Sequence, residues 1–153
     1  MPRVSESLPT VVLRRARPED LPSIEALLAA ERLPLAGVRE HLGGFLVAVT
    51  AGGVIGAIGL ESYGDVALLR SAVVAPAARR RGVAALLTMR IVEDARARGV
   101  RALYLLTETA AGHFERADFR RIARADMPRA LDASAELSGA CPESAVCMVK
   151  TLA

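Results

Sequence analysis

Residues 66–107 read as strand, helix and strand in direct succession, and this unit constrains the fold more than any other part of the chain. An apolar run at 66–74 is followed by a helical pattern over 82–98, which Gly99 ends. The apolar run at 100–107 comes after the helix, so we expect it to lie parallel to the first strand. The sequence therefore predicts a right-handed β-α-β crossover.

The turn inside this unit, within residues 73–85, has the features of an anion-binding site. Pro76 ends the strand, and Gly82 opens the helix where its first amides have no intrahelical acceptor. The turn also carries three consecutive arginines, Arg79, Arg80 and Arg81. Free amides, the positive end of the helix dipole and a residue without Cβ all suit a phosphate or pyrophosphate. A solvated run of charge is the alternative interpretation of the arginines.

The elements around the crossover indicate a mixed architecture. Glycine-rich turns join predicted strands at 45–49, 54–63 and 66–74 into an antiparallel meander. The remaining predicted elements are a strand at 11–16, a helix entered through 17–20, short helices at 35–42 and 109–117, a strand at 119–123, an ambiguous stretch at 126–139 in which a short helix is favoured, and a last strand at 145–149. The helical face over residues 83–95 is predicted to be formed by Val83, Leu86, Leu87, Ile91 and Ala95.

Length and composition exclude several classes of protein. The 153 residues fit one domain, 52% of them are hydrophobic, and charged residues cut the apolar runs well short of a membrane span. The net charge is +3, but aromatic residues make up only 3%, which poorly supplies the stacking platforms of nucleic-acid binders. Residues 4–10 do not resemble a secretory signal, so we expect a cytoplasmic protein without membrane or nucleic-acid partners. Cys141 and Cys147 are interpreted as reduced structural cysteines.

Two common nucleotide-binding motifs do not fit the turn. A Walker loop needs a lysine after its second glycine, and the one lysine of the sequence is Lys150. A dinucleotide fingerprint begins an all-parallel unit, whereas a meander precedes this turn. The pattern Arg-x-x-Gly-x-Ala, at Arg79, Gly82 and Ala84, instead resembles the acyl-CoA motif of the GNAT superfamily of N-acetyltransferases.

This resemblance extends over nearly the whole chain and implies a fold and a donor. The implied fold is a single GNAT domain, an α/β protein with a mixed sheet of about six or seven strands flanked by helices. The donor is acetyl-CoA, and no metal is implied. The residues expected to hold acetyl-CoA are Val73 and Val74 through their backbones, Arg79, Arg80, Arg81, Gly82, Val83 and Ala84 around the pyrophosphate, and Phe114.

Within the superfamily, the sequence is most similar to acetyltransferases of arsenic-resistance operons. The similar stretches are residues 33–38, 59–64, 67–71, 103–107 and 141–145. This similarity implies an amino-acid-like acceptor, with an arsenical amino acid as one such compound. A homodimer is left open.

One departure from the superfamily concerns proton transfer. Many members carry a tyrosine as general acid where this chain has Phe114, which cannot donate a proton. His113 is a substitute candidate, and an exposed histidine of no special role is the alternative. Asp118 replaces the usual glycine of the same segment, and because aspartate tolerates left-handed geometry, we expect the turn to survive.

Candidate acceptor-side residues lie on the meander. An alkyl ammonium loses its proton only at about pH 10, so acetyl transfer needs a base, and Glu61 is the first candidate. Alternation puts it on one face with Gly59 and Tyr63, and Tyr63 is a candidate for orienting substrate or protonating the thiolate. A solvated carboxylate is the alternative for Glu61, and simple packing is the alternative for Tyr63.

Arg70 lies inside an apolar strand, where a guanidinium needs a carboxylate partner. That partner is either Glu61 or a substrate carboxylate held by two parallel hydrogen bonds. Glu31 and Arg39 are weaker candidates for binding the substrate.

The sequence therefore predicts direct acetyl transfer from acetyl-CoA to a small amine in a ternary complex. Two alternatives remain open at this stage. One is an acyl-CoA-binding sensor without catalysis on the same fold, and the other is a basic nucleic-acid-binding module.

Overall fold

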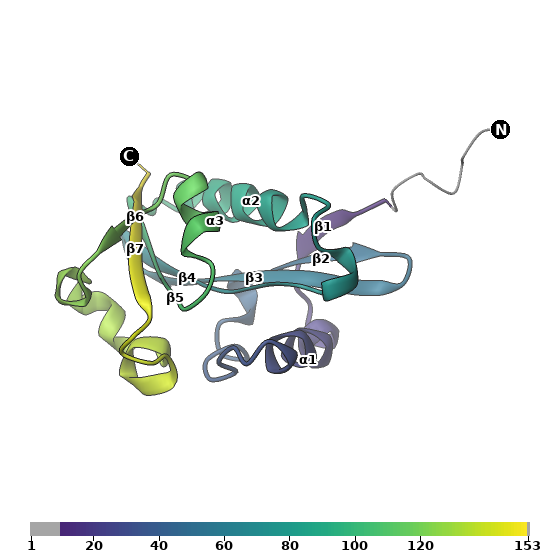
Figure 1. Cartoon of the computed structure of the whole chain (residues 1–153), viewed down its shortest axis with the longest axis horizontal. Coiled ribbons are helices and arrows are strands. Elements are labelled where there is room, and N and C mark those ends of the chain that lie inside the picture. Colours follow the sequence, from purple (N-terminus) through teal and green to yellow (C-terminus); the bar gives the residue numbers. More distant parts are fainter. Residues whose placement is uncertain (1–9, 153) are drawn as a thin grey trace.

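The structure is a computed structural model that describes residues 10–152 (Figure 1). The expectation about residues 4–10 falls almost wholly outside the described residues. Within them, seven strands form one mixed sheet in the order β1-β2-β3-β4-β5-β7-β6. The strands are β1 Val12–Arg15, β2 Leu46–Thr50, β3 Gly53–Tyr63, β4 Val66–Val74, β5 Ala102–Thr107, β6 Arg120–Ile122 and β7 Val146–Thr151, and the α-helices are α1 Leu21–Ala30, α2 Val83–Ala97 and α3 Ala111–Arg116. The predicted mixed α/β fold is confirmed.

The pairing of the strands confirms both the meander and the crossover. Strands β1 to β4 are antiparallel neighbours, and β4 pairs with β5 in parallel after the connection through α2. The last strand, β7, lies between β5 and β6 and is antiparallel to both. The β4-turn-α2 junction therefore stands in the middle of the sheet.

The helices cover both faces of the sheet (Figure 1). Helices α2 and α3 lie on one face and bury Leu87, Ile91 and Phe114 against it. Helix α1 covers part of the other face with Ile24 and Leu28, and the segment after β6 covers the rest through Leu131. The prediction that Leu86 belongs to the packed face of α2 is wrong: it is 43% exposed, and the buried face turns toward Thr88 and Val92 instead.

Strand β4 contains a β-bulge at Ser71. Gly59 of β3 faces Arg70, but Ala57 faces Val73, so β4 has one residue more than β3 across this interval. Ser71 takes up the extra residue with a left-handed φ of 60°. After the bulge, the side chains of β4 alternate in the opposite phase, and Val73 joins the core under α1.

Two predicted helices are not regular helices. Residues 36–41 form turns, because Gly37 has a φ of 87°, which an α-helix cannot contain. A Cβ at Gly37 would lie 2.7 Å from Nη1 of Arg70, so the chain folds closely over that side chain. In the stretch 126–139, the structure has a 3-10 turn, Arg129–Ala133, and then a single π-helical turn, Glu136–Ala140. Leu131 anchors this segment on the sheet.

Candidate active site

A cavity opens where the two central parallel strands separate. Their pairing runs from Val66 with Ala102 to Leu69 with Leu105 and stops there. Beyond this point lies a cavity of about 600 Å³, lined by residues 71–74 of β4 on one side and 105–110 on the other. We call it the split-strand cavity. The exposed edge of a separated strand offers backbone donors and acceptors to an extended ligand.

The N-terminus of α2 forms one end of the split-strand cavity. Gly82 precedes the helix with a φ of 79°, and Ala84 in the first turn lines the cavity. Arg79 also lines it, and its Nε donates to the carbonyl of Val74 at 3.1 Å. Glu31 lines the same part and pairs with Arg79, with 2.9 Å between the Oε2 and Nη2 atoms.

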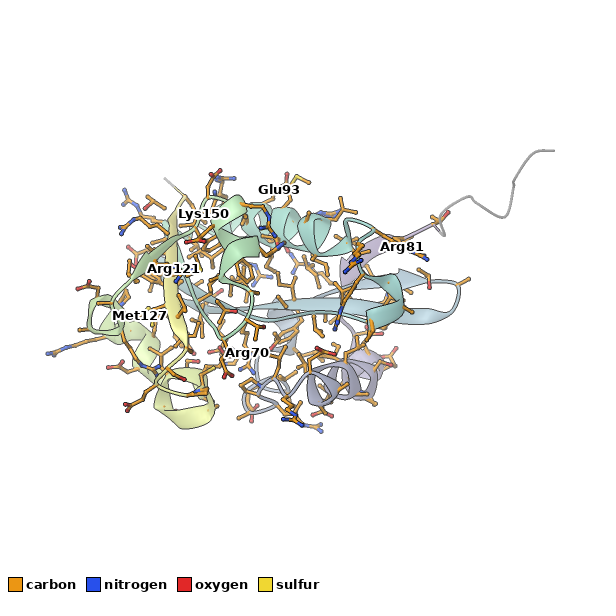
Figure 2. All side chains as sticks on the ribbon, viewed as in Figure 1. Arg70, Arg81, Glu93, Arg121, Met127 and Lys150 are labelled. Carbon is orange, nitrogen blue, oxygen red and sulfur yellow. The ribbon has the colours of Figure 1, made fainter. Side chains whose placement is uncertain are left out.

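The other residues of the predicted pyrophosphate site have different surroundings. Arg80 and Arg81 are exposed, and Val83 is buried beside the α2 N-terminus. Figure 2 shows Arg81 on the turn that leads into α2. Arg39 is exposed and does not line the cavity, so the structure does not bring it to the other candidates.

A buried polar cluster forms the opposite end of the cavity. Its centre is Arg70, which is 2% exposed and lines the cavity on the face of the sheet that carries α1 (Figure 2). Arg70 donates from Nη1 to Oε2 of Glu61 at 2.7 Å and from Nε to Oγ of Ser71 at 2.9 Å. Its Nη2 donates to the carbonyl of Pro34 at 3.1 Å. All three guanidinium nitrogens are therefore engaged within the protein.

Glu61 is fully buried, and it does not line the cavity. The solvated-carboxylate alternative is therefore wrong, and the predicted Arg70 pair is present. Burial would raise the pKa of Glu61, but hydrogen bonds from Tyr63, Arg70 and Ser134 outweigh it, so the pKa is lowered. The Tyr63 hydroxyl donates to Oε1 of Glu61, as the predicted shared face allows. Burial and this carboxylate raise the pKa of Tyr63 to about 12.

A second carboxylate, Glu136, was missed from the sequence. It lies in the π-helical turn before β7, is 3% exposed and lines the cavity. Its Oε2 lies 3.5 Å from Nε of Arg70. Burial raises the pKa of Glu136 to about 7, against the opposing effect of Arg70. The available signal was Arg70 itself, since a buried guanidinium indicates nearby carboxylates but not which ones.

Cys141 lines this end of the cavity together with Glu136. Burial and the Glu136 carboxylate raise the pKa of Cys141 to about 12, so this thiol stays protonated at neutral pH. Cys141 and Cys147 are both free cysteines, as expected. Within residues 10–152, no three metal-binding side chains gather into a site.

The α3 side of the cavity contains His113 and Phe114. Phe114 is 3% exposed and stacks edge-on against Phe119, while its neighbour His113 lies 3.0 Å from Oγ1 of Thr88 through Nε2. Thr88 donates its own hydroxyl proton to the carbonyl of Ala84, so Nε2 of His113 is the donor in their contact. Burial and then Arg116 lower the pKa of His113, which keeps the imidazole neutral at pH 7.

The turn after α3 forms as predicted despite the replacement of glycine. Asp118 has a φ of 71°, and the amide of Phe119 donates to the carbonyl of Phe114 at 3.0 Å, which closes the helix end.

Among the described helices, none combines the length and apolar composition that a membrane span requires.

Splayed parallel strands, with a helix N-terminus at one end of the gap and buried ionisable groups at the other, form a cavity whose shape suits an elongated anionic ligand. The model of the acetyltransferase (GNAT) family matches residues 12–119, which is well over half of the chain. The chain therefore belongs to the acetyltransferase (GNAT) family. The matched region contains the splayed strands, the α2 N-terminus and Arg70, but it ends before Glu136.

Solved structures share the fold at low sequence identity. N-acetylglutamate synthase from Neisseria gonorrhoeae, complexed with coenzyme A and N-acetyl-glutamate, has a TM-score of 0.81 at 21% identity over 96% of this chain and 36% of its own. Rv2747 from Mycobacterium tuberculosis, in complex with CoA and NLQ, has a TM-score of 0.77 at 23% identity over 93% of this chain and 99% of its own. A GNAT-family acetyltransferase from Staphylococcus aureus Mu50 has a TM-score of 0.74 at 15% identity over 94% of this chain and all of its own.

The chain thus spans about a third of the length of the gonococcal synthase and nearly all of Rv2747. No curated protein matches the sequence.

Proposed function

We propose that this protein transfers the acetyl group of acetyl-CoA to the primary amine of a small, amino-acid-like acceptor within a ternary complex. The observation that carries the proposal is the split-strand cavity, which joins an anion-binding helix end to a buried ionisable cluster. One end suits the pyrophosphate of coenzyme A, and the other offers groups that exchange protons. Both reactants can therefore occupy one continuous space.

The donor fits the geometry of the β4 side. Residues 71–74 line the cavity beyond the end of the β4–β5 pairing, so the backbone groups of Val73 and Val74 can form hydrogen bonds with the amides of a pantetheine arm. The free amides at the α2 start would hold the pyrophosphate, with Arg79 beside them and Arg80 and Arg81 reaching from the surface. Phe114 would pack against the arm from the α3 side, because it lines the same cavity.

Two observations support an amino-acid-like acceptor. The gonococcal synthase that shares the fold is complexed with N-acetyl-glutamate, and the acceptor end of this cavity contains charged groups that suit a charged small molecule. The similarity to arsenic-resistance acetyltransferases adds an arsenical amino acid to the acceptors that we propose. Arg70 already donates hydrogen bonds to Glu61, Ser71 and Pro34, so binding a substrate carboxylate would compete with these three bonds.

The reaction needs no covalent enzyme intermediate. The amine nitrogen, once deprotonated, attacks the thioester carbonyl carbon and forms the new C–N bond. The C–S bond then breaks, sulfur leaves with the electron pair, and the thiolate takes up a proton to give free coenzyme A. Holding both reactants in one cavity supplies the orientation that makes this displacement fast.

The test is release of free coenzyme A thiol from acetyl-CoA, measured against a panel of amines that contains α-amino acids, arsenical amino acids, and simple alkylamines of matched length. We expect turnover with amino-acid-like amines and weaker turnover with alkylamines that lack a carboxylate. Tight acetyl-CoA binding without turnover on any amine would refute the proposal and favour a sensor.

A further inference from the structure

We propose that Glu136 is the base that takes the proton from the acceptor ammonium, and that the Arg70–Glu61 pair positions it. The inference rests on the proposed function, because it assigns a role within that reaction. It differs from the sequence-based expectation, which gave the base role to Glu61. The family match ends at residue 119, so Glu136 lies beyond the part that the family model describes.

Access to the cavity separates the two carboxylates. Glu136 lines the split-strand cavity, whereas Glu61 does not and is fully buried behind Arg70. Glu61 accepts hydrogen bonds from Tyr63 and Arg70, which commit both of its oxygens to the protein. A base must lie within hydrogen-bond reach of the proton that it abstracts, and of the two only Glu136 meets a ligand in the cavity.

The charges around Glu136 do not balance. Arg70 supplies one positive charge, and Glu61 and Glu136 together supply two negative charges when both are ionised. The thiol of Cys141 and the hydroxyl of Tyr63 are neutral at pH 7, since burial raises the pKa of each to about 12. Two further groups face the cluster: His41, whose Nε2 lies 3.6 Å from Oε1 of Glu61, and Arg124, a cation that donates to the carbonyl of Leu137 at 3.5 Å but forms no ion pair with Glu61 or Glu136 among the described residues.

Within the described residues, Arg70 is the buried cation that faces both carboxylates, so one negative charge is in excess around it when Glu136 is ionised. Either a proton on Glu136 or a cation entering the cavity removes this excess. An ammonium group is a cation that also carries a transferable proton, so it meets both needs. The arrangement attracts the charged form of the acceptor and then converts it to the reactive one.

The ammonium gives one proton to Glu136, whose carboxylate becomes a neutral carboxyl group, and the nitrogen keeps its electron pair. That pair forms the bond to the thioester carbon, and the C–S bond breaks to leave a thiolate. The nitrogen then loses its second proton, which neutralises the thiolate, and Glu136 returns its own proton to solvent when the products leave.

The experiment compares Glu136→Gln with Glu143→Gln, a control that makes the same change on the exposed segment before β7. We expect Glu136→Gln to lower kcat/KM for the amine by about 10²- to 10⁴-fold while acetyl-CoA affinity stays within about threefold. Wild-type kcat/KM should fall as the pH drops below about 7, and Glu136→Gln should lack that limb. Added formate should partly restore the rate of Glu136→Ala, in which a small carboxylate can enter the vacated space.

Each outcome decides between the ideas. A Glu136→Gln enzyme that binds acetyl-CoA and keeps the acidic limb overturns the inference and leaves the proposed function standing. An acidic limb that disappears in His41→Asn assigns the limb to His41 and also overturns it. Failure of wild-type enzyme to acetylate any amine overturns both proposals. Loss of the limb in Glu136→Gln, together with recovery of the Glu136→Ala rate in formate, supports the base role.

Discussion

Removing the charge of Glu136 should stabilise the fold, and the effect should depend on pH. The folded-state pKa of Glu136 is raised from 4.5 to about 7, mainly by burial. Between these values, the folded protein holds a proton that the unfolded chain has lost. The free energy of unfolding therefore falls as the pH rises from 4.5 to about 7, and it stays lower at higher pH. Glu136→Gln carries no titrating proton at this position, so it escapes the loss.

The size of the effect follows from the same two pKa values. One pH unit corresponds to about 1.4 kcal/mol, so the window from 4.5 to about 7 gives an upper value of about 3 kcal/mol. For a chain of this length, 1 kcal/mol changes Tm by about 2–4 °C. The Tm of Glu136→Gln relative to wild type should therefore rise by up to about 10 °C between pH 4.5 and pH 8.

Thermal unfolding followed by circular dichroism across this pH range is the assay, and it needs neither substrate. Glu143→Gln serves as the control, because it makes the same change at an exposed position. A Tm difference between Glu136→Gln and wild type that does not change with pH would refute the reasoning, since it would mean that Glu136 titrates alike in folded and unfolded chains. A charged active-site residue commonly lowers the stability of the fold, so replacing it raises stability while activity is lost.

Three further perturbations follow from the structure. Gly82→Glu should abolish acetyl-CoA binding in calorimetry, because it places a carboxylate at the proposed anion site, whereas Gly82→Ala should keep measurable binding. Normal binding by the folded Glu variant would mean that the pyrophosphate lies elsewhere. Arg70→Met should lower the free energy of unfolding by about 3–5 kcal/mol, because it leaves the buried Glu61 carboxylate without its arginine partner. Adding Glu61→Gln to this variant should recover part of the loss in urea denaturation. Losses that simply add in the double variant would contradict this. Gly37→Ala should lower the free energy of unfolding by about 1–3 kcal/mol more than Gly64→Ala does. Both glycines have positive φ, but of the two only Gly37 would place a Cβ against Arg70. Equal losses for the two variants would contradict the close approach of Gly37 to Arg70.

The architecture, and the turn that we propose as the donor site, could be predicted because their signals are local. The alternation of apolar residues, the glycine turns and the break at Pro76 each act over a few neighbours. The proposed anion site likewise needs only Gly82 and the start of a helix. The structure therefore confirms the meander, the crossover and the order of strand, turn and helix around residue 82.

The acceptor end could be predicted only in part, because its residues come from distant segments. Arg70 and Glu61 share adjacent strands, and their pairing was foreseeable from that register. Glu136 lies in a stretch without helical or strand periodicity, where 3-10 and π turns are held by packing of Leu131 rather than by local preference. Its approach to Arg70 depends on how that stretch crosses the sheet, which no local pattern specifies.

The bulge at Ser71 divides β4 into two halves with independent roles. Before it, Arg70 belongs to the buried polar cluster; after it, Val73 and Val74 line the part of the cavity that we propose for the donor, with their side chains in the opposite phase. Deleting one residue at the bulge would restore a continuous register with β3 and would leave Val73 opposite Ala57, on its present face. Because the phase changes at one residue, we expect substitutions on 66–70 to leave the alternation of 72–74 intact. In the proposed reaction, the acceptor side of β4 can therefore change while the proposed donor side keeps its geometry.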